Sequence, residues 1–169
     1  MRIVIATAGV LSPEGVARFT ERLAGPDGKV SVITVIEVPR SFLDDIRSEE
    51  WHPLTEGPAN WTEEEDALIA RYVEERGARS TEPLLAALTA SGVDAEVVYL
   101  EGEDPAATIV SAAAELQADV LVLGATKQLF DDWESITSRV MREAGRPVLV
   151  MPTAPKVEDA AEPSSDHGA

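Results

Sequence analysis

The sequence predicts one α/β domain in which a five-stranded parallel sheet is covered by helices on both faces. Two observations favour this fold class. Short apolar runs alternate with longer helical segments along the 169 residues. The runs are continuously apolar rather than alternating with polar residues, which is typical of strands buried on both faces of a sheet. The length suits one domain of ordinary size.

Composition excludes several classes of partner and site. The chain has 14 basic and 31 acidic residues, and its formal net charge is −17. A surface so acidic repels nucleic acid and anionic membranes, so we expect neither as a partner. The absence of cysteine excludes disulfides and thiolate chemistry. Without a signal segment or an apolar run of about 20 residues, a cytoplasmic location is expected.

The first quarter of the chain predicts a strand, a helix and a second strand. Residues 2–7 form an apolar run, and the Ser-Pro pair at 12–13 is a helix-start signal, with a capping hydroxyl before a first-turn proline. We expect Val16 and Phe19 on the buried face of this helix. A "GPDG" turn then leads into the second apolar run, residues 30–38.

The middle of the chain is less regular. Residues 40–60 predict a loop or lid with one short helical turn. A long helix is expected from Thr62, with acidic residues in its first turn and an apolar stripe that includes Leu68. Pro83 lies inside this helix, where a proline predicts a kink or a break. The helix should end at Gly92.

The C-terminal part completes the alternation. The remaining strands are expected over residues 94–102, 118–124 and 147–152, and the remaining helices from Asp104 and over residues 135–145. The tail, residues 153–169, is polar and contains prolines, so we expect it to be disordered. The domain should therefore span residues 1–152.

Ligands of such sheets bind beyond the carboxyl ends of the strands, where the strand order reverses. The candidate site therefore lies at the ends of the first and fourth strands, with Thr7 and Ala8 from one strand and Gly124 and Ala125 from the other. A loop leads from this glycine to a helix that opens at Ser135. That arrangement is how phosphate-binding turns are usually built.

Several segments, in chain order, resemble the universal stress protein family. "IVIATAG" is similar to its first strand, "VITVIEVP" to its second, and "SRVMREAGRPVLVMP" to its closing helix and strand. The resemblance implies an adenine nucleotide alpha hydrolase-like fold with strand order 3-2-1-4-5, a dimer and, in many members, bound ATP. Val35 matches the residue that lies beside the adenine in that family.

The family's ATP motif is altered in this chain. Its second glycine falls on Lys127, its aspartate after the first strand falls on Ala8, and six residues rather than nine separate Lys127 from the position before Ser135. The residues that the resemblance places around a nucleotide are Thr7, Ala8, Val35, Gly124, Ala125, Lys127, Ser135 and Thr137. Ser135 has a purely structural alternative, which is to cap the last helix.

The shortened loop is also acidic, with Asp131, Asp132 and Glu134. A carboxylate about 5 Å from a phosphate charge costs roughly 3 kcal/mol at an effective dielectric of about 20, and roughly 0.6 kcal/mol when fully solvated at about 7 Å. We therefore expect no cofactor and no ATP in the usual mode. A divalent metal bridging carboxylates and phosphates would reverse this. Trp133 either fills the vacant pocket or contacts a partner.

No enzyme signature is present. The sequence lacks a nucleophile elbow, a P-loop and a dinucleotide turn, and its two histidines lie far apart, so neither is expected to bind a metal. The predicted function is a dimeric stress-response regulatory or interaction module. The alternative is an ATP-binding nucleotide sensor. An apolar edge strand invites pairing, so we expect a homodimer formed through Val148, Leu149, Val150 and Met151.

Overall fold

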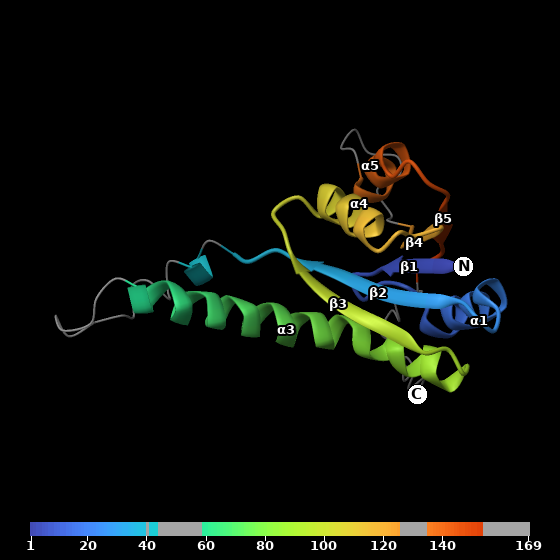
Figure 1. The fold of residues 1–169 in the computed structure, drawn as a ribbon, viewed down its shortest axis with the longest axis horizontal. Coiled ribbons are helices and arrows are strands. Elements are labelled where there is room, and N and C mark those ends of the chain that lie inside the picture. The colour runs from blue at the N-terminus through green and yellow to red at the C-terminus, as the bar shows by residue number, and fades with distance from the viewer. Residues whose placement is uncertain (40, 44–58, 126–134, 154–169) are drawn as a thin grey trace, which may run out of the picture.

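The computed structural model describes residues 1–39, 41–43, 59–125 and 135–153. Five parallel strands form one sheet in the order β3-β2-β1-β4-β5 (Figure 1), which confirms the predicted fold class. The strands are β1 (Arg2–Ala6), β2 (Lys29–Ile36), β3 (Ala95–Glu101), β4 (Val120–Gly124) and β5 (Val148–Met151).

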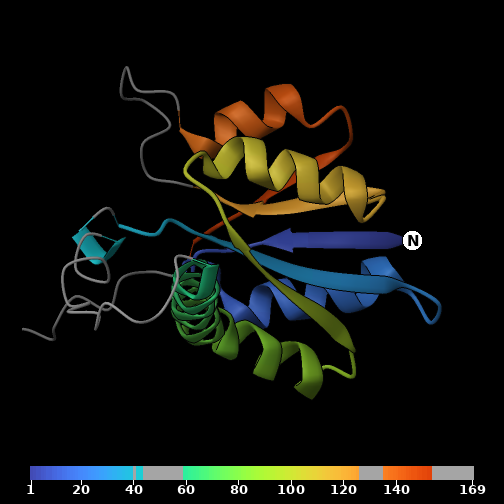
Figure 2. The ribbon, with the colours of Figure 1, turned by 60° about the vertical axis from the view of Figure 1, so that its left-hand side comes forward.

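Helices cover both faces of the sheet (Figure 2), as the apolar strands predict. They are α1 (Pro13–Ala24), α3 (Ala59–Ala90), α4 (Pro105–Glu115) and α5 (Ile136–Glu143). Helices α1 and α3 pack together on one face, and α4 and α5 pack together on the other. Residues 41–43 form one helical turn, as expected in the 40–60 segment. Residues 40 and 44–58 lie outside the described residues.

Alternation along the strands divides the interior into two cores. Toward α4 and α5, the strands bury one cluster of side chains, which comprises Val4, Ala6, Ile33, Leu121 and Leu123 with Ile109, Ala113 and Val140 from the helices. Toward α1 and α3, they bury a second cluster, which comprises Ile3, Ile5, Val30, Val32 and Val122 with Val16, Ala17, Leu84 and Leu88. Because both faces are covered, every position of the central strands can be apolar.

Helix α1 begins where the Ser-Pro signal predicts, but two details of that prediction are wrong. Ser12 occupies the N-cap position without any hydrogen bond from its side chain to the helix. Phe19 is 37% exposed, whereas the neighbouring Thr20 is fully buried. The hydroxyl of Thr20 has no hydrogen-bond partner. The buried face of α1 therefore carries the hydroxyl of Thr20, whereas the sequence pattern predicts that the ring of Phe19 is buried.

Helix α3 runs without interruption from Ala59 to Ala90, so of the kink or break predicted at Pro83 the break is excluded. The helix changes direction along its length. In Figure 2 its first turns are seen nearly end-on, whereas its last turns run obliquely. Pro83 has no N–H to donate within the helix. The hydroxyls of Ser80 and Thr81 donate to the carbonyl of Gly77, at 3.0 and 2.9 Å, and such bonds bend helices.

Gly77 also sets how closely α3 approaches the sheet. A Cβ atom at this position would clash with the ring of Tyr99 on β3, so only glycine lets the helix lie this close. The helix ends as predicted at Gly92, which has a φ of 74°. The N–H of Gly92 donates to the Thr89 carbonyl at 3.0 Å, and that of Val93 to the Leu88 carbonyl at 2.9 Å. These two bonds form a Schellman motif.

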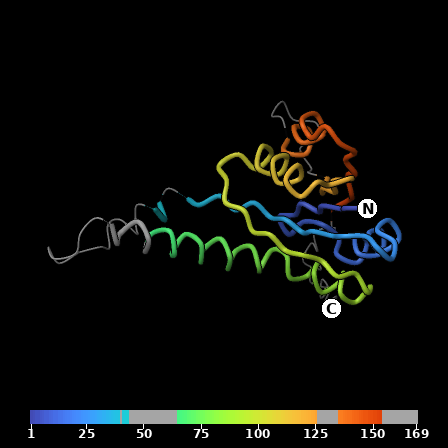
Figure 3. Tube along the Cα trace, in the orientation of Figure 1, coloured from blue at the N-terminus to red at the C-terminus, as the bar shows by residue number. Residues whose placement is uncertain are grey.

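The first turns of α3 extend past the carboxyl ends of the strands (Figure 3). The ring of Tyr72 contacts that of Phe42, with centroids 4.5 Å apart, and the Arg76 guanidinium lies over the same Tyr72 ring. Leu68 is 43% exposed, so the predicted inward stripe does not include it. Within the described parts of the chain, no helix is long and apolar enough to cross a membrane.

Candidate functional site

A cavity of about 290 Å³ lies at the carboxyl ends of the strands, beside the junction between β1 and β4. This is the position at which the reversal of strand order predicts a ligand. Its walls come from the ends of β1, β2 and β4 and from the starts of α4 and α5. The lining residues are Ala6, Thr7, Ala8, Val10, Ile33, Val35, Glu37, Pro105, Ile109, Leu123, Gly124, Ile136 and Thr137.

Five of the predicted site residues line this cavity, namely Thr7, Ala8, Val35, Gly124 and Thr137. Ala125 and Ser135 do not line it. The N–H of Ala125 donates to the Met151 carbonyl at 2.7 Å and so continues the pairing of β4 with β5. Lys127 lies outside the described residues, as do Asp131, Asp132, Trp133 and Glu134.

Gly124 has a packing role at the base of the cavity. A Cβ atom here would lie 3.3 Å from Leu11 Cδ2 and 3.4 Å from Val10 Cγ2, so the glycine admits the segment that follows β1. Its backbone is extended, as the last residue of β4, and not left-handed. The one glycine that matches the nucleotide motif therefore has a structural reason to be glycine that requires no phosphate.

Hydrogen bonds within the protein engage the hydroxyls of Ser135 and Thr137 at the start of α5. Ser135 is the N-cap of this helix, and its hydroxyl accepts the N–H of Ser138 at 3.1 Å. The same Ser135 oxygen lies 2.9 Å from the Ser138 hydroxyl. The Thr137 hydroxyl donates to the Gly124 carbonyl at 3.0 Å, which ties α5 to the end of β4. Ser135 thus takes the structural role predicted for it as a cap.

The segment after β1 is also fixed by internal bonds. The N–H of Gly9 donates to the Thr7 hydroxyl at 3.0 Å, and the N–H of Thr7 donates to the Ile33 carbonyl at the same distance. Gly9 has a φ of 79°, a conformation that favours glycine. This turn places Ala8, where the family has an aspartate, on the cavity wall.

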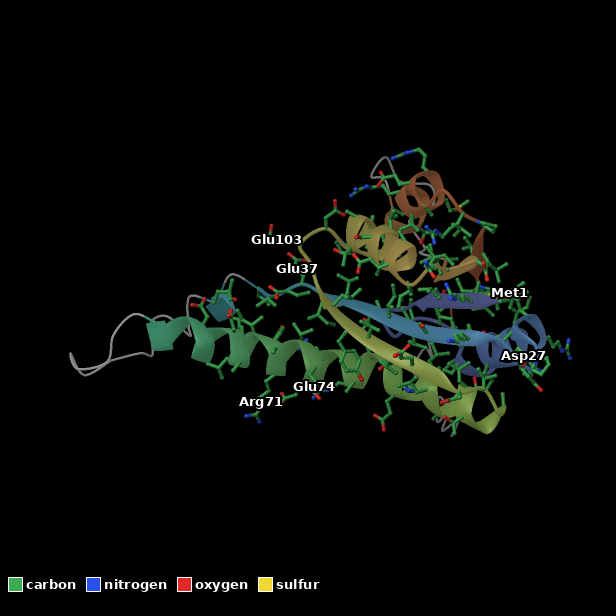
Figure 4. All side chains as sticks on the ribbon, viewed as in Figure 1. Met1, Asp27, Glu37, Arg71, Glu74 and Glu103 are labelled. Carbon is green, nitrogen blue, oxygen red and sulfur yellow. The ribbon has the colours of Figure 1, made fainter. Side chains whose placement is uncertain are left out.

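Glu37 carries the one charged side chain among the described residues that line the cavity. It is exposed and follows β2, as Figure 4 shows. No motif in the sequence contains Glu37, although its spacing from Val35 is a signal. Side chains two residues apart on an extended chain point to the same side, so Glu37 follows Val35 on the cavity side. Val10, Pro105 and Ile136, which also line the cavity, carried no signal of their own.

An ion pair joins the starts of the two helices above the cavity. Arg139 of α5 donates to both carboxylate oxygens of Asp104, at 2.9 and 3.0 Å. The Arg139 hydrogen bonds, followed by the Ala107 N–H, hold the pKa of Asp104 below its ordinary value. The bonds to Asp104 and then to Glu143 raise the pKa of Arg139. This cation is therefore engaged by two carboxylates of the chain itself.

Metal binding has no support among residues 1–39, 41–43, 59–125 and 135–153. No three histidine, cysteine, aspartate or glutamate side chains gather there in a way that would hold a metal ion. His52 and His167 both lie outside these ranges. The cavity itself is suited to holding an apolar group by contact, with few polar atoms to orient it.

Known proteins share this architecture. The model of the universal stress protein family matches residues 1–152. The chain is similar in structure to hypothetical protein MJ0577, with a TM-score of 0.61, 20% identity, and coverage of 91% of this chain and 96% of the other. The search of the curated proteins found no match.

Two further structures similar to the chain were solved with a nucleotide. One is a universal stress protein in complex with cAMP, with a TM-score of 0.54, 20% identity, and coverage of 91% of this chain and 98% of the other. The second is a universal stress protein family protein from Arabidopsis thaliana with AMP bound, with a TM-score of 0.53, 15% identity, and coverage of 98% and 99%. At such identities the likeness shows the fold alone.

Proposed function

Because the chain belongs to the universal stress protein family, we propose that it is a regulatory or interaction module that does not bind ATP in the usual mode of that family. The observation that carries this proposal is the state of two hydroxyls, those of Ser135 and Thr137, that the resemblance places around a nucleotide. Ser135 caps its own helix, and the proton of the Thr137 hydroxyl is donated to Gly124. The Ser135 hydroxyl therefore has only its own proton to offer a phosphate, and the Thr137 hydroxyl would have to break its bond to Gly124 in order to donate.

Charge adds a second argument. Glu37, the charged residue among the described ones that line the cavity, is an acid. The nearby Arg139 already forms ion pairs with Asp104 and Glu143. Because Glu37 is exposed, the value for full solvent applies, and at about 7 Å its carboxylate opposes each phosphate charge by roughly 0.6 kcal/mol. The acids predicted to matter in the loop, such as Asp131, would add to this opposition if they face the cavity.

A second candidate function is binding of an adenine nucleotide as a signal. The relatives solved with cAMP and AMP favour it, because they share this fold over nearly their whole length. The cavity of about 290 Å³ lies where a ligand of this fold is expected. The two candidates differ in one measurable property, which is affinity for the charged phosphate tail.

We also propose that the protein is a homodimer and catalyses no reaction of its own. β5 is an edge strand whose four residues are all half-buried within one chain, and pairing with a second copy would cover them further. No described residue provides a nucleophile paired with a base beside the cavity, which supports a binding role.

Isothermal titration with ATP and Mg²⁺ tests the proposal. The protein is first checked for a native circular dichroism spectrum and for the absence of copurified nucleotide. We expect no stoichiometric binding heat. Tight binding of one ATP per chain would refute the proposal and establish the nucleotide sensor in its place. Release of ADP or AMP from ATP during the same incubation would refute the non-enzymatic assignment.

A further inference from the structure

We infer that the cavity selects its ligand by charge, taking a neutral or cationic nucleoside in preference to the phosphorylated form, and that Glu37 sets this preference. The inference rests on the proposed function, which excludes the usual mode of ATP binding, and it goes further by naming the class of molecule that the site accepts. It assigns to Glu37 a role that none of the motif residues has.

The walls of the cavity are suited to a flat or apolar group. Val35, Ile109, Leu123 and Ile136 contribute aliphatic side chains, and Pro105 contributes a ring. Val10 and Ile136, at 45% and 43% exposure, remain accessible from solvent beside the cavity. Ligand sites of this kind gain affinity from apolar contact and specificity from a few polar groups. The identity of those few polar groups therefore decides which ligand fits.

Among the described residues that line the cavity, the polar side chains are the hydroxyls of Thr7 and Thr137 and the carboxylate of Glu37, and none is a cation. The Thr7 hydroxyl accepts the N–H of Gly9 and keeps its own proton. The Thr137 hydroxyl already donates its proton to Gly124, so toward a ligand its oxygen can act only as an acceptor. The Glu37 carboxylate is an acceptor while it is ionised. A nucleoside offers hydroxyl and amino protons to such acceptors. A phosphate group offers negatively charged oxygens, which gain nothing from the Glu37 carboxylate or the Thr137 oxygen.

Other carboxylates extend the negative region around Glu37. The N–H of Gly102 donates to the Ile36 carbonyl at 3.2 Å, and this bond holds the connection between β3 and α4 against the end of β2. Glu103 follows in that connection, and Figure 4 shows it at the same end of the sheet as Glu37. Asp104 comes next but is neutralised by Arg139. The described carboxylates at this end of the sheet therefore oppose anions and favour cations, against the positive ends of the α4 and α5 helix dipoles.

The size of the effect follows from Coulomb's law. For a charge about 7 Å from Glu37 in full solvent, the carboxylate changes affinity by roughly three-fold per unit charge, and more where the dielectric is lower. Because AMP carries close to two charges on its phosphate, we expect roughly ten-fold weaker binding of AMP than of adenosine. Salt should reduce this difference, because exposed charges are screened beyond about 8 Å at physiological ionic strength.

A charge series on one scaffold tests the inference. The probes are 5′-amino-5′-deoxyadenosine, adenosine and AMP, which share the base and sugar and differ at the 5′ position. Each is titrated into the wild type, into Glu37→Gln and into Glu96→Gln at low and high salt. Glu37 is exposed, so its substitution leaves the core intact. Glu96 is the matched control, because it lies near the amino end of β3, far along the strand from the cavity.

We expect affinity in the wild type to fall from the amine through adenosine to AMP. Glu37→Gln should bring AMP to within a few-fold of adenosine, whereas Glu96→Gln should behave as the wild type does. Equal wild-type affinities for adenosine and AMP, or a gap that Glu37→Gln leaves unchanged, would overturn the role of Glu37. Absence of adenosine binding would overturn the ligand class while leaving the proposed function intact. Tight binding of ATP would instead refute the proposed function.

Discussion

The hydroxyl of Thr137 donates to the carbonyl of Gly124 across 3.0 Å and joins the first turn of α5 to the end of β4. Thr137 is 3% exposed, so water does not easily replace this bond. Thr137→Val keeps the shape of the side chain and removes the donor. We expect the free energy of unfolding, measured by urea titration, to fall by about 1 kcal/mol. An unchanged midpoint would mean that the bond does not form in solution.

Thr20→Val is the matched substitution with the opposite expectation. Thr20 is also buried, but its hydroxyl has no partner, and the group already carries an unmet desolvation cost. Replacing it by a methyl group should leave the free energy of unfolding unchanged or raise it by about 1 kcal/mol. A loss comparable to that of Thr137→Val would indicate that Thr20 has a partner, such as buried water.

Periodicity in the sequence predicts the order of strands and helices well because each apolar run must be buried on both sides. It fails at Phe19 and Leu68, both of which are more than one-third exposed. On α1 the adjacent Thr20 is buried instead, and on α3 Val73, five residues after Leu68, is buried. A helical stripe is wide, and the exact rotation of the helix is decided by the surface against which it packs. That surface is a tertiary property that the local pattern does not contain.

The fit between Gly77 and Tyr99 gives a third prediction. Alanine normally stabilises a helix interior relative to glycine by about 1 kcal/mol. At Gly77 the added Cβ would meet the root of the Tyr99 ring, which cannot swing away as a flexible chain end does. We therefore expect Gly77→Ala to lower the free energy of unfolding by roughly 1–3 kcal/mol.

Gly15→Ala on α1 is the control for this substitution. A Cβ atom there would lie 3.3 Å from the Ser12 hydroxyl oxygen, which can rotate away. This variant should gain roughly the helix propensity of alanine. If urea titrations show that both alanine variants are more stable than the wild type, α3 does not pack as closely on β3 in solution as Gly77 and Tyr99 indicate.

The ion pair between Asp104 and Arg139 predicts how stability depends on pH. The pKa of Asp104 is held below its ordinary value in the folded state. Its contribution is therefore complete above the ordinary carboxylate pKa of about 3.9 and is lost as the pH falls through the lowered value. The raised pKa of Arg139 matters only at strongly alkaline pH. Asp104 is the N-cap of α4, where its side chain accepts the Ala107 N–H at 3.2 Å, and Asp104→Asn retains a capping side chain, so it isolates the charge.

We expect Asp104→Asn to be less stable than the wild type at pH 7 and to approach it at pH values below those at which the aspartate titrates. Urea midpoints at neutral and acid pH give the comparison. Asp27→Asn, which removes a charge from the turn between α1 and β2, controls for the change in net charge (Figure 4). A constant difference between Asp104→Asn and the wild type at all pH values would contradict the account.

Pairing through β5 predicts a dimer in sedimentation experiments at low micromolar concentration. Val148 packs against the core beneath α4 and α5, and Leu149 and Met151 pack against the core beneath α1. Val150 is the position at which a charge disturbs these contacts least. Val150→Lys should give monomers with an unchanged circular dichroism spectrum, because charged edge strands resist pairing. A wild type that sediments only as a monomer would exclude the dimer.

The candidate site was predictable where it depends on topology and less so where it depends on side-chain chemistry. The reversal of strand order indicates Thr7 and Gly124, and both line the cavity. Ser135 lies nearby as the helix cap that its position predicts, whereas the bond from Ala125 to Met151 is not evident from chain position alone. Glu37 was missed because no motif contains it. Its importance follows from being the charged side chain on the described part of the cavity wall.

Native mass spectrometry of protein purified without added ligand tests the central claim most directly, which is that this cavity does not hold a polyphosphate. The account predicts the mass of the chain alone, or that mass raised by a molecule without phosphate, in the dimer as well as in any monomer. A mass raised by ATP on wild-type protein, persisting through buffer exchange, would contradict it.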